Sequence, residues 1–320
     1  MKIIVLDGFT LNPGDLNWVN LQSLGALTVY DRTQHSTEAT VERIGSAEIV
    51  LTNKVPITKE VIDACPNLKY IGVLATGYNV VATSYAKEKN IVVSNVPSYS
   101  TDSVAQFTMG LLLEMCHQIG SHSNDVKKGQ WQNSPDFCFW NHPLIELKNK
   151  TMGIIGFGSI GQATAKLAQA FGLNVIVHTR TVKPEFESDT LRFVDLDTLF
   201  KESDIISLHC PLFESTKGII NAVNIDKMKT GVKLINTSRG PLVVEKDLTD
   251  ALNKEKISGA AVDVVSEEPI NPNNPLLKAK NCIITPHIAW APKEARTRLL
   301  QITIDNIIAF QRNEPINVVN

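Results

Sequence analysis

A glycine-rich segment near the middle of the chain limits the possible fold more than any other feature. The segment Gly156–Gly161 reads G-F-G-S-I-G, follows the apolar run Met152–Ile155 and precedes Gln162–Phe171, which has helical periodicity. Between a strand and a helix, the first glycine of this pattern makes a tight turn, the second lets the backbone approach a pyrophosphate, and the third lets helix and strand pack closely. The sequence therefore predicts a dinucleotide-binding turn. Its expected contact residues are Gly156, Gly158, Ser159, Ile160 and Gly161.

Short apolar runs alternate with helical stretches on both sides of this turn. Before residue 100 the strand-like runs are Lys2–Leu6, Ala26–Tyr30, Ala47–Leu51, Tyr70–Leu74 and Ile91–Ser94. From residue 151 onward they are Met152–Ile155, Asn174–His178, Ile205–His209, Val232–Asn236, Ser258–Val262 and Cys282–Thr285. Strands that alternate with helices are typical of βαβ units and parallel sheets. We therefore expect an α/β protein with two doubly wound parallel sheets, for which 320 residues suffice.

Three further segments stand apart from this alternation. Thr101–Gln118 has apolar residues near the helical period, and it predicts a long helix that bridges the two halves. Periodicity fades over Ser121–Lys150, where aromatic residues stand among Asn, Ser, Pro and Asp, so we expect a long ordered loop or short helices. Pro292–Phe310 predicts a last helix with proline in its first turn, where the missing N–H costs nothing.

Charge and cysteine content exclude several classes of protein. The 31 basic residues nearly cancel the 33 acidic ones, so there is no broad positive field for nucleic acid or a membrane surface. The five cysteines stand singly, unlike those of a disulfide scaffold or a zinc knuckle, and we expect no metal site. Neither a secretory signal nor about 18 uninterrupted apolar residues occurs. These observations predict a cytoplasmic protein that binds neither nucleic acid nor a membrane.

The residues after the run Val175–Val177 bear on which dinucleotide is bound. A carboxylate about 20 residues after the glycine turn would accept hydrogen bonds from the adenosine ribose, but this strand leads into His178-Thr179-Arg180. An acid would repel a 2′-phosphate, whereas a hydroxyl beside a guanidinium can bind one. The sequence therefore favours NADP over NAD, with Thr179, Arg180 and Lys183 as the discriminating groups. The alternative is that Arg180 is a solvated surface charge.

Ordered motifs along nearly the whole chain connect it to a known family. They are Ala75-Thr76-Gly77-Tyr78-Asn79, Ser103-Val104-Ala105-Gln106, the glycine turn, His209-Cys210-Pro211-Leu212, Asn236-Thr237-Ser238-Arg239-Gly240, Asp263, Glu268-Pro269, and Thr285-Pro286-His287-Ile288-Ala289-Trp290. In this order they resemble the D-isomer-specific 2-hydroxyacid dehydrogenases, most closely the glycerate dehydrogenase (hydroxypyruvate and glyoxylate reductase) branch. The resemblance implies a Rossmann cofactor domain over residues 100–289. It also implies a flavodoxin-like substrate domain over residues 1–99 and 290–320.

The resemblance also implies a catalytic triad. Arg239 takes the place of the substrate-binding arginine, Glu268 that of the acid paired with the catalytic histidine, and His287 that of the proton donor and acceptor. Chemistry supports these roles, because reducing a 2-keto acid requires a fixed cation, a proton for the developing alkoxide and a hydride from reduced nicotinamide. Taken singly, each residue has an ordinary alternative, since most arginines and glutamates are solvated and an isolated histidine is more often structural.

Further contacts follow only from the resemblance. Asp263 is expected to contact the nicotinamide carboxamide, and the backbone N–H groups of Thr76 and Gly77 are expected to hold the substrate carboxylate. The remaining expected cofactor contacts are Val104, Cys210, Pro211, Thr237 and Ala289. Trp140 is expected to form one side of the substrate pocket of a neighbouring subunit. The alternative is that it only packs in a dimer interface.

Together these features imply a homodimeric NAD(P)-dependent oxidoreductase, joined through its cofactor domain, that reduces hydroxypyruvate or glyoxylate to a D-2-hydroxy acid. Closure of its two lobes would exclude water. Two alternatives stay open. One is reduction of pyruvate or of a bulkier 2-keto acid on the same scaffold, which depends on pocket size. The other is a dinucleotide-sensing corepressor; such proteins carry extra tails for their partners, whereas this chain ends soon after its last helix.

Overall fold

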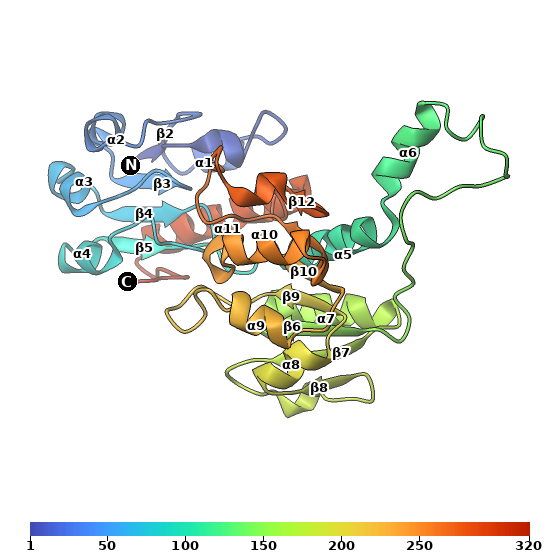
Figure 1. Ribbon diagram of the computed structural model, residues 1–320. Coiled ribbons are helices and arrows are strands. Elements are labelled where there is room, and N and C mark those ends of the chain that lie inside the picture. Colours follow the sequence, from blue (N-terminus) through green and yellow to red (C-terminus); the bar gives the residue numbers. More distant parts are fainter. The chain divides into compact units, whose positions relative to one another are not determined.

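In the computed structural model, which describes all 320 residues, the chain divides into two compact units. The first unit comprises Met1–Ser100 and Trp290–Asn320, and the second comprises Thr101–Ala289. Each unit is built on its own parallel sheet (Figure 1). The expected fold class, α/β with two doubly wound parallel sheets, is thereby confirmed. No helix is both long enough and apolar enough to cross a membrane.

The first unit contains a five-stranded sheet in the order β2-β1-β3-β4-β5. Its strands are β1 (Lys2–Val5), β2 (Ala26–Val29), β3 (Ile49–Thr52), β4 (Tyr70–Val73) and β5 (Val92–Ser94). All neighbouring strands are parallel. This is the flavodoxin-like order, in which the chain starts at an inner strand and builds outward on either side of it.

Helices cover both faces of this sheet, because successive side chains of a strand point in opposite directions. Ile3 and Val5 share a core with α11 (Lys293–Gln311), whereas Ile4 belongs to the core on the other face. The remaining helices of the unit are α1 (Val19–Gln22), α2 (Thr37–Ile44), α3 (Lys59–Ala64) and α4 (Thr83–Glu88), with the 3-10 turn η1 (Gly8–Thr10). With both faces covered, β3 and β4 are buried along their whole length.

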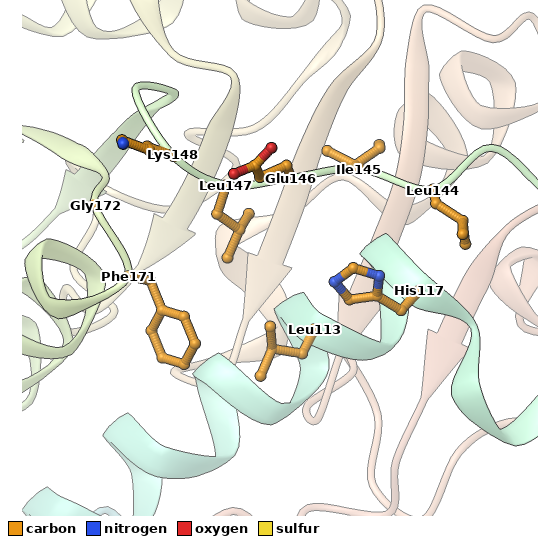
Figure 2. Close-up of a pocket in the computed structure, with 9 residues that line it drawn as sticks. All are labelled: Leu113, His117, Leu144, Ile145, Glu146, Leu147, Lys148, Phe171 and Gly172. Atoms are coloured by element: carbon orange, nitrogen blue, oxygen red, sulfur yellow. The ribbon is translucent and has the colours of Figure 1, made fainter.

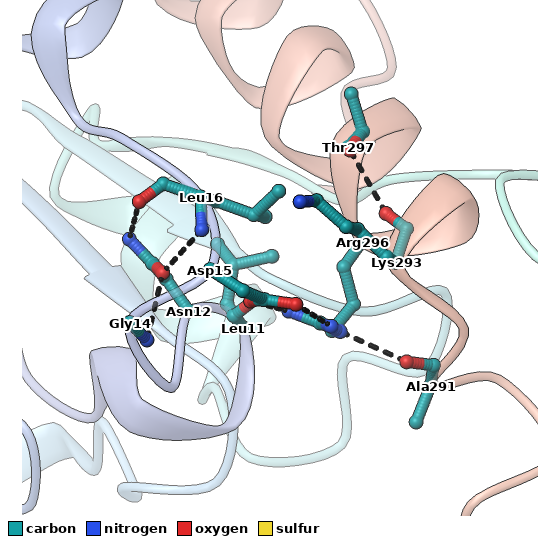
Figure 3. Close-up of polar contacts among 9 residues, drawn as sticks. All are labelled: Leu11, Asn12, Gly14, Asp15, Leu16, Ala291, Lys293, Arg296 and Thr297. Carbon is teal, nitrogen blue, oxygen red and sulfur yellow. Dashed lines mark hydrogen bonds and ion pairs between the residues drawn. The ribbon is translucent and has the colours of Figure 1, made fainter.

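A buried arginine fixes the start of α11 within the first unit (Figure 3). Arg296 is 7% exposed, and its guanidinium donates two hydrogen bonds of 2.7 Å to Asp15. It also donates to the backbone carbonyls of Leu11 and Ala291. Pro292 lies just before the first helical residue with extended backbone, so the predicted helix start within Pro292–Phe310 is corrected by one residue.

The second unit contains a seven-stranded sheet in the order β12-β11-β10-β9-β6-β7-β8. Its strands are β6 (Thr151–Ile155), β7 (Asn174–His178), β8 (Leu191–Phe193), β9 (Ile205–Leu208), β10 (Val232–Asn236), β11 (Ile257–Val262) and β12 (Cys282–Ile284). All neighbouring strands are again parallel. The edge strand β8 is not predicted by the sequence, since only Leu191 among its three residues is buried and Arg192 is exposed.

Two helical layers enclose the seven-stranded sheet. One layer, α5 (Thr101–His117) and α7 (Ser159–Ala170), forms a core with side chains such as Ile154 and Val175. The opposite layer packs on residues such as Ile155 and Ile176. It consists of α8 (Leu196–Glu202), α9 (Ala222–Lys227) and α10 (Glu245–Asn253), with the short turns η2 (Pro184–Phe186), η3 (Gly240–Leu242) and η4 (Pro275–Lys278) nearby in the chain.

The strand order of the second unit places a ligand site. The chain enters the sheet at β6, builds β7 and β8 on one side, and then returns to the other side of β6 for β9, β10, β11 and β12. Loops that follow β6 and β9 therefore diverge, which opens a crevice at the carboxyl ends of the strands. The predicted glycine turn follows β6 directly, so it lies at this crevice.

One segment of the second unit departs from its layers. Helix α6 (Ile119–Lys127) and the loop that follows it project away from the sheet of that unit (Figure 1). No residue of α6 is buried. The expected loop or short helices between residues 121 and 150 are thus one helix followed by turns, which we term the arm (residues 119–144).

Candidate active site

The glycine turn after β6 has the geometry that its three glycines suggest. Gly156 has a φ of +97°, and a Cβ there would lie 2.6 Å from the backbone nitrogen of Cys210 at the end of β9. A Cβ at Gly161 would lie 2.2 Å from the carbonyl oxygen of Gly156. A side chain at either position would therefore force the helix or β9 away from β6. At Gly158, by contrast, a Cβ would meet no atom within 4 Å, which leaves open space for a ligand.

The start of α7 offers unpaired donors to that open space. No side chain caps this helix, and the backbone N–H groups of its first turn, Ser159 to Gly161, have no partner within the helix. A 12-residue helix also contributes the positive end of its dipole there. The residues present thus fit the pyrophosphate of a dinucleotide.

The end of β7 contains no carboxylate, as the sequence indicates. His178 places Nδ1 3.3 Å from the carbonyl oxygen of Val194, Thr179 is half-buried, and Arg180 is exposed. Neither Thr179 nor Arg180 has a hydrogen-bond or ion-pair partner in the chain. Their donors are therefore available to a ligand at the end of this strand.

Buried polar groups shape the ends of β9 and β10. Ser238 donates a 2.6 Å hydrogen bond to the carbonyl of Cys210, which ties the two strand ends together. Burial raises the pKa of the Cys210 thiol to about 11, so the thiol is neutral near pH 7. The hydroxyl of Thr237 lies 3.1 Å from that of Thr108 on α5, and Thr108 in turn donates to the carbonyl of Val104. Val104 itself is 5% exposed, so only a small apolar surface of it can face a cofactor.

A neutral histidine, His209, lies beside Cys210, and no role for it follows from its motif alone. His209 Nε2 lies 2.8 Å from the hydroxyl of Ser207. Burial lowers the pKa of His209 to about 4, so the ring carries no charge near pH 7. The alternation Ser207-Leu208-His209 places both polar side chains on one face of β9, which is a signal that the sequence alone does contain.

Glu268 and His287 are in direct contact. The Nδ1 atom of His287 lies 2.6 Å from the Oε2 atom of Glu268, and each side chain is about one-third exposed, 31% and 34% respectively. The other carboxylate oxygen of Glu268 accepts a hydrogen bond from the N–H of Val265. With Nδ1 bound to the carboxylate, the Nε2 atom of His287 is the one left for a substrate.

Asp263 fixes the turn that carries His287. The Asp263 side chain is 1% exposed and accepts hydrogen bonds from the hydroxyl of Thr285 at 2.6 Å and from the backbone N–H groups of Ile288 and Ala289 at 2.9 Å. Between these donors, His287 adopts the left-handed conformation, with a φ of +55°. The carboxylate expected to contact nicotinamide is thus already bound within the chain, and its direct contact to a cofactor stays a prediction.

Arg239 lies on the same edge of the sheet. Its neighbour Gly240 packs so closely that a Cβ there would lie 1.9 Å from the carbonyl oxygen of Val265, in the loop that leads to Glu268. The guanidinium of Arg239 is exposed and bonds only the carbonyl of Ser238, at 2.7 Å. Since β10, β11 and β12 are adjacent, Arg239, Glu268 and His287 follow three neighbouring strand ends.

In the first unit, the expected carboxylate-binding loop follows β4. The hydroxyl of Thr76 donates to the carbonyl of Val96, and the amide of Asn95 donates to the carbonyl of Thr76. These two contacts fix the loop. The backbone N–H groups of Thr76 and Gly77 themselves donate to no group of the chain, so they remain available to an anion.

An apolar groove lies away from the glycine turn. It is an open groove of about 700 Å³ beside α5, lined mainly by apolar side chains such as Leu113, Leu144 and Phe171 (Figure 2). Trp140 lies in the adjoining arm and is 63% exposed. It does not line this groove.

Comparisons with known proteins connect the chain to one family. The model of the family "D-isomer specific 2-hydroxyacid dehydrogenase, NAD binding domain" matches residues 109–289. A hydroxypyruvate reductase of Blautia hydrogenotrophica is 56% identical over 321 aligned residues that cover 100% of both chains. A glycerate dehydrogenase of Methylorubrum extorquens is 41% identical over 88% of each chain. A solved acyclic imino acid reductase, in complex with NADPH and D-Arg, is 32% identical with a TM-score of 0.84 over 100% of both chains.

Proposed function

The chain belongs to the D-isomer-specific 2-hydroxyacid dehydrogenase family and is an NAD(P)-dependent oxidoreductase. From this premise we propose that it reduces hydroxypyruvate and glyoxylate to the corresponding 2-hydroxy acids, with the D configuration where the product is chiral. The observation that carries the proposal is the contact between Glu268 and His287 on the sheet edge that also bears the glycine turn. An imidazole held by a carboxylate is the group that carbonyl reduction requires as its proton donor.

The proposed reaction adds a hydride and a proton to the keto group. The bound reduced nicotinamide supplies the hydride. His287 donates the proton from Nε2 to the carbonyl oxygen, and Glu268 keeps the ring in position through Nδ1. The turn held by Asp263 gives the imidazole a fixed direction, so little reorganisation is needed as the alkoxide develops.

Arg239 is proposed to bind the substrate carboxylate and polarise the keto oxygen. Its guanidinium presents a planar fork of donors, is exposed, and makes only one bond within the chain. The free N–H groups of Thr76 and Gly77 are proposed as further donors to the carboxylate. Three or more donors around one carboxylate would favour an acid over a simple ketone.

Cofactor preference is a finer part of the proposal. The cofactor residues proposed are those of the glycine turn together with Thr179 and Arg180, and we propose NADP as the favoured dinucleotide. The absence of a carboxylate after β7 and the unpartnered guanidinium of Arg180 support this choice, because both favour a 2′-phosphate.

We also propose that the enzyme is a cytoplasmic homodimer joined through its second unit. The arm exposes large apolar side chains, among them Ile119 at 61%, Trp131 at 52%, Phe137 at 89% and Trp140 at 63%. These side chains and the apolar groove beside α5 (Figure 2) are suited to contact with a second copy of the same chain. The five cysteines, all free and apart from one another, suit a reducing compartment.

Initial rates test the proposed function. Hydroxypyruvate, glyoxylate, pyruvate and phenylpyruvate are each assayed with NADH and with NADPH. The proposal predicts the highest kcat/KM for hydroxypyruvate or glyoxylate, and higher values with NADPH. Faster reduction of phenylpyruvate than of either small acid would overturn the substrate assignment, and no reduction of any of the four would overturn the proposed activity.

A further inference from the structure

A second polar cavity lies at the other edge of the seven-stranded sheet. Its volume is about 130 Å³, and it is formed by residues that precede or begin β6, β9 and β10 together with the end of α5. Because all these strands are parallel, this amino-terminal edge is opposite the edge that bears the glycine turn. The cavity therefore takes no part in the proposed reaction.

Lys233 lines this cavity. It is 7% exposed, and its ammonium group makes one hydrogen bond, 3.3 Å long, to the hydroxyl of Ser258. That hydroxyl already donates its proton to the carbonyl of Gly231 at 2.6 Å. Lys233 forms no ion pair with any carboxylate of the chain. A nearly buried charge without a counter-charge is costly, and burial accordingly lowers the pKa of Lys233.

The other charged groups around the cavity leave an excess of positive charge. Asp204 is the only acid that lines it, and both its oxygens are occupied, one by the ammonium of Lys229 and one by the N–H of Thr151, each at 2.8 Å. Burial raises the pKa of Asp204, but these two hydrogen bonds and the nearby charges of Lys229 and Lys150 outweigh it, and the net shift is downward. Lys150 lines the cavity as well and forms no ion pair.

The remaining lining is not anionic near pH 7. Burial raises the pKa of the Cys116 thiol, at the end of α5, so no thiolate balances Lys233. The other lining residues are Ile145, Ile205, Thr230, Gly231 and Val232. The cavity thus combines three lysines with one carboxylate that is already neutralised.

We propose that this cavity binds a phosphate group. A lysine acts as a point charge toward phosphate, and two lysines without anionic partners match a dianion. A cavity of about 130 Å³ is large enough for one tetrahedral oxyanion. The phosphate is either inorganic phosphate or the phosphoryl group of a small phosphorylated acid.

Thermal unfolding and calorimetry of the full chain test this site. The protein is saturated with reduced cofactor so that the glycine turn is filled, and inorganic phosphate is then titrated at constant ionic strength against chloride. Phosphate should raise Tm through its binding to the folded state. Lys233→Met should weaken phosphate binding by at least about tenfold, and Lys150→Met should weaken it less. Lys201→Met, at an exposed position of α8, should leave it unchanged.

A parallel titration with 3-phosphoglycerate distinguishes the two sources of the phosphate group. Tighter binding of 3-phosphoglycerate than of inorganic phosphate, with the same dependence on Lys233, would assign the site to a phosphorylated acid. The reverse order would assign it to free phosphate. Equal phosphate effects in wild type and in both Lys233→Met and Lys150→Met, or equal effects of chloride and phosphate, would overturn the proposal. If Lys233→Met does not fold, the effect of Lys150→Met on phosphate binding decides the test. Tm and calorimetry do not depend on the enzyme's activity.

Discussion

The two edges of the seven-stranded sheet differ in whether their key charged side chains have partners within the chain. At the carboxyl edge, Glu268 holds His287 and Asp263 holds the turn around it, so the acids there have partners and fixed positions. At the amino edge, Lys233 is nearly buried without an anion. At the carboxyl edge, the paired charges hold a reacting group in position. At the amino edge, an unpaired charge in a cavity indicates that a ligand from outside the chain supplies the counter-charge.

The largest expected difference between the edges is in turnover. His287→Ala removes the proposed proton donor and should lower kcat for hydroxypyruvate by about two to four powers of ten. Cofactor affinity, measured by fluorescence titration, should stay nearly unchanged. Lys233→Met, at the other edge, should leave kcat within about twofold of wild type. Unchanged turnover in His287→Ala would remove this residue as the acid.

Asp263 gives the next largest effect. Asp263→Ala leaves two backbone N–H groups and the Thr285 hydroxyl without their acceptor, which releases the turn of His287. A reacting group misplaced by about 1 Å can cost as much as 10²-fold, so kcat should fall by about 10–100-fold. Asp263→Asn keeps one oxygen acceptor and should recover part of this loss.

Asp204→Asn, at the amino edge, serves as the control for Asp263. It removes a partly buried carboxylate that also accepts two hydrogen bonds, but none of its partners belongs to the proposed active site. It should lower Tm without lowering kcat. If Asp263→Ala likewise lowered Tm but left kcat unchanged, the proposed role of Asp263 in positioning His287 would be wrong.

Arg180→Ala should have a smaller effect that is confined to one cofactor. Loss of a single exposed guanidinium contact to phosphate should raise the Kd for NADPH by about tenfold and change the Kd for NADH little. Lys201→Ala removes a positive charge elsewhere on the second unit and should change neither constant. Equal weakening of both dinucleotides by Arg180→Ala would exclude its contact to a 2′-phosphate.

The smallest predicted effect is on stability at the amino edge. The pKa of Lys233 is lower in the folded than in the unfolded chain, so folding disfavours its charged form, and wild type loses stability as the pH falls toward the folded-state pKa. Without phosphate, Lys233→Met should therefore raise Tm at pH 7 by about 2–4 °C, the shift that ~1 kcal/mol produces in a unit of this size. The difference should shrink as the pH approaches the unfolded value near 10.5. A difference that is constant or grows with pH would contradict the lack of a counter-charge.

Sequence periodicity was sufficient for most of the fold. Eleven of the twelve strands were expected, because buried strands of a parallel sheet are continuous apolar runs between helical stretches. The edge strand β8 was missed, since Leu191–Phe193 is short and only one of its residues is buried. Helix α6 was only partly anticipated, because a helix with no buried residue has no apolar stripe in its sequence.

The candidate site was predictable to a different extent at each edge. Along the carboxyl edge, turns such as Gly156 and Gly240 need glycine for reasons of backbone space, and these needs leave motifs in the sequence. Asp263 accepts hydrogen bonds from the backbone N–H groups of Ile288 and Ala289. Every residue except proline has such a group, so the sequence gives no signal of these bonds. Lys233 resembles any surface lysine in the sequence, and only its position at the start of β10 shows that it is buried.

The most direct test of the account is a crystal structure of the protein with NADPH and oxalate, an unreactive analogue of a 2-keto acid. We predict an oxalate oxygen within about 2.6–3.2 Å of Nε2 of His287. We also predict that Glu268 still contacts Nδ1, and that the guanidinium of Arg239 contacts the carboxylate. Oxalate bound away from His287, or a His287 ring that has left Glu268 in the complex, would contradict the proposed proton transfer.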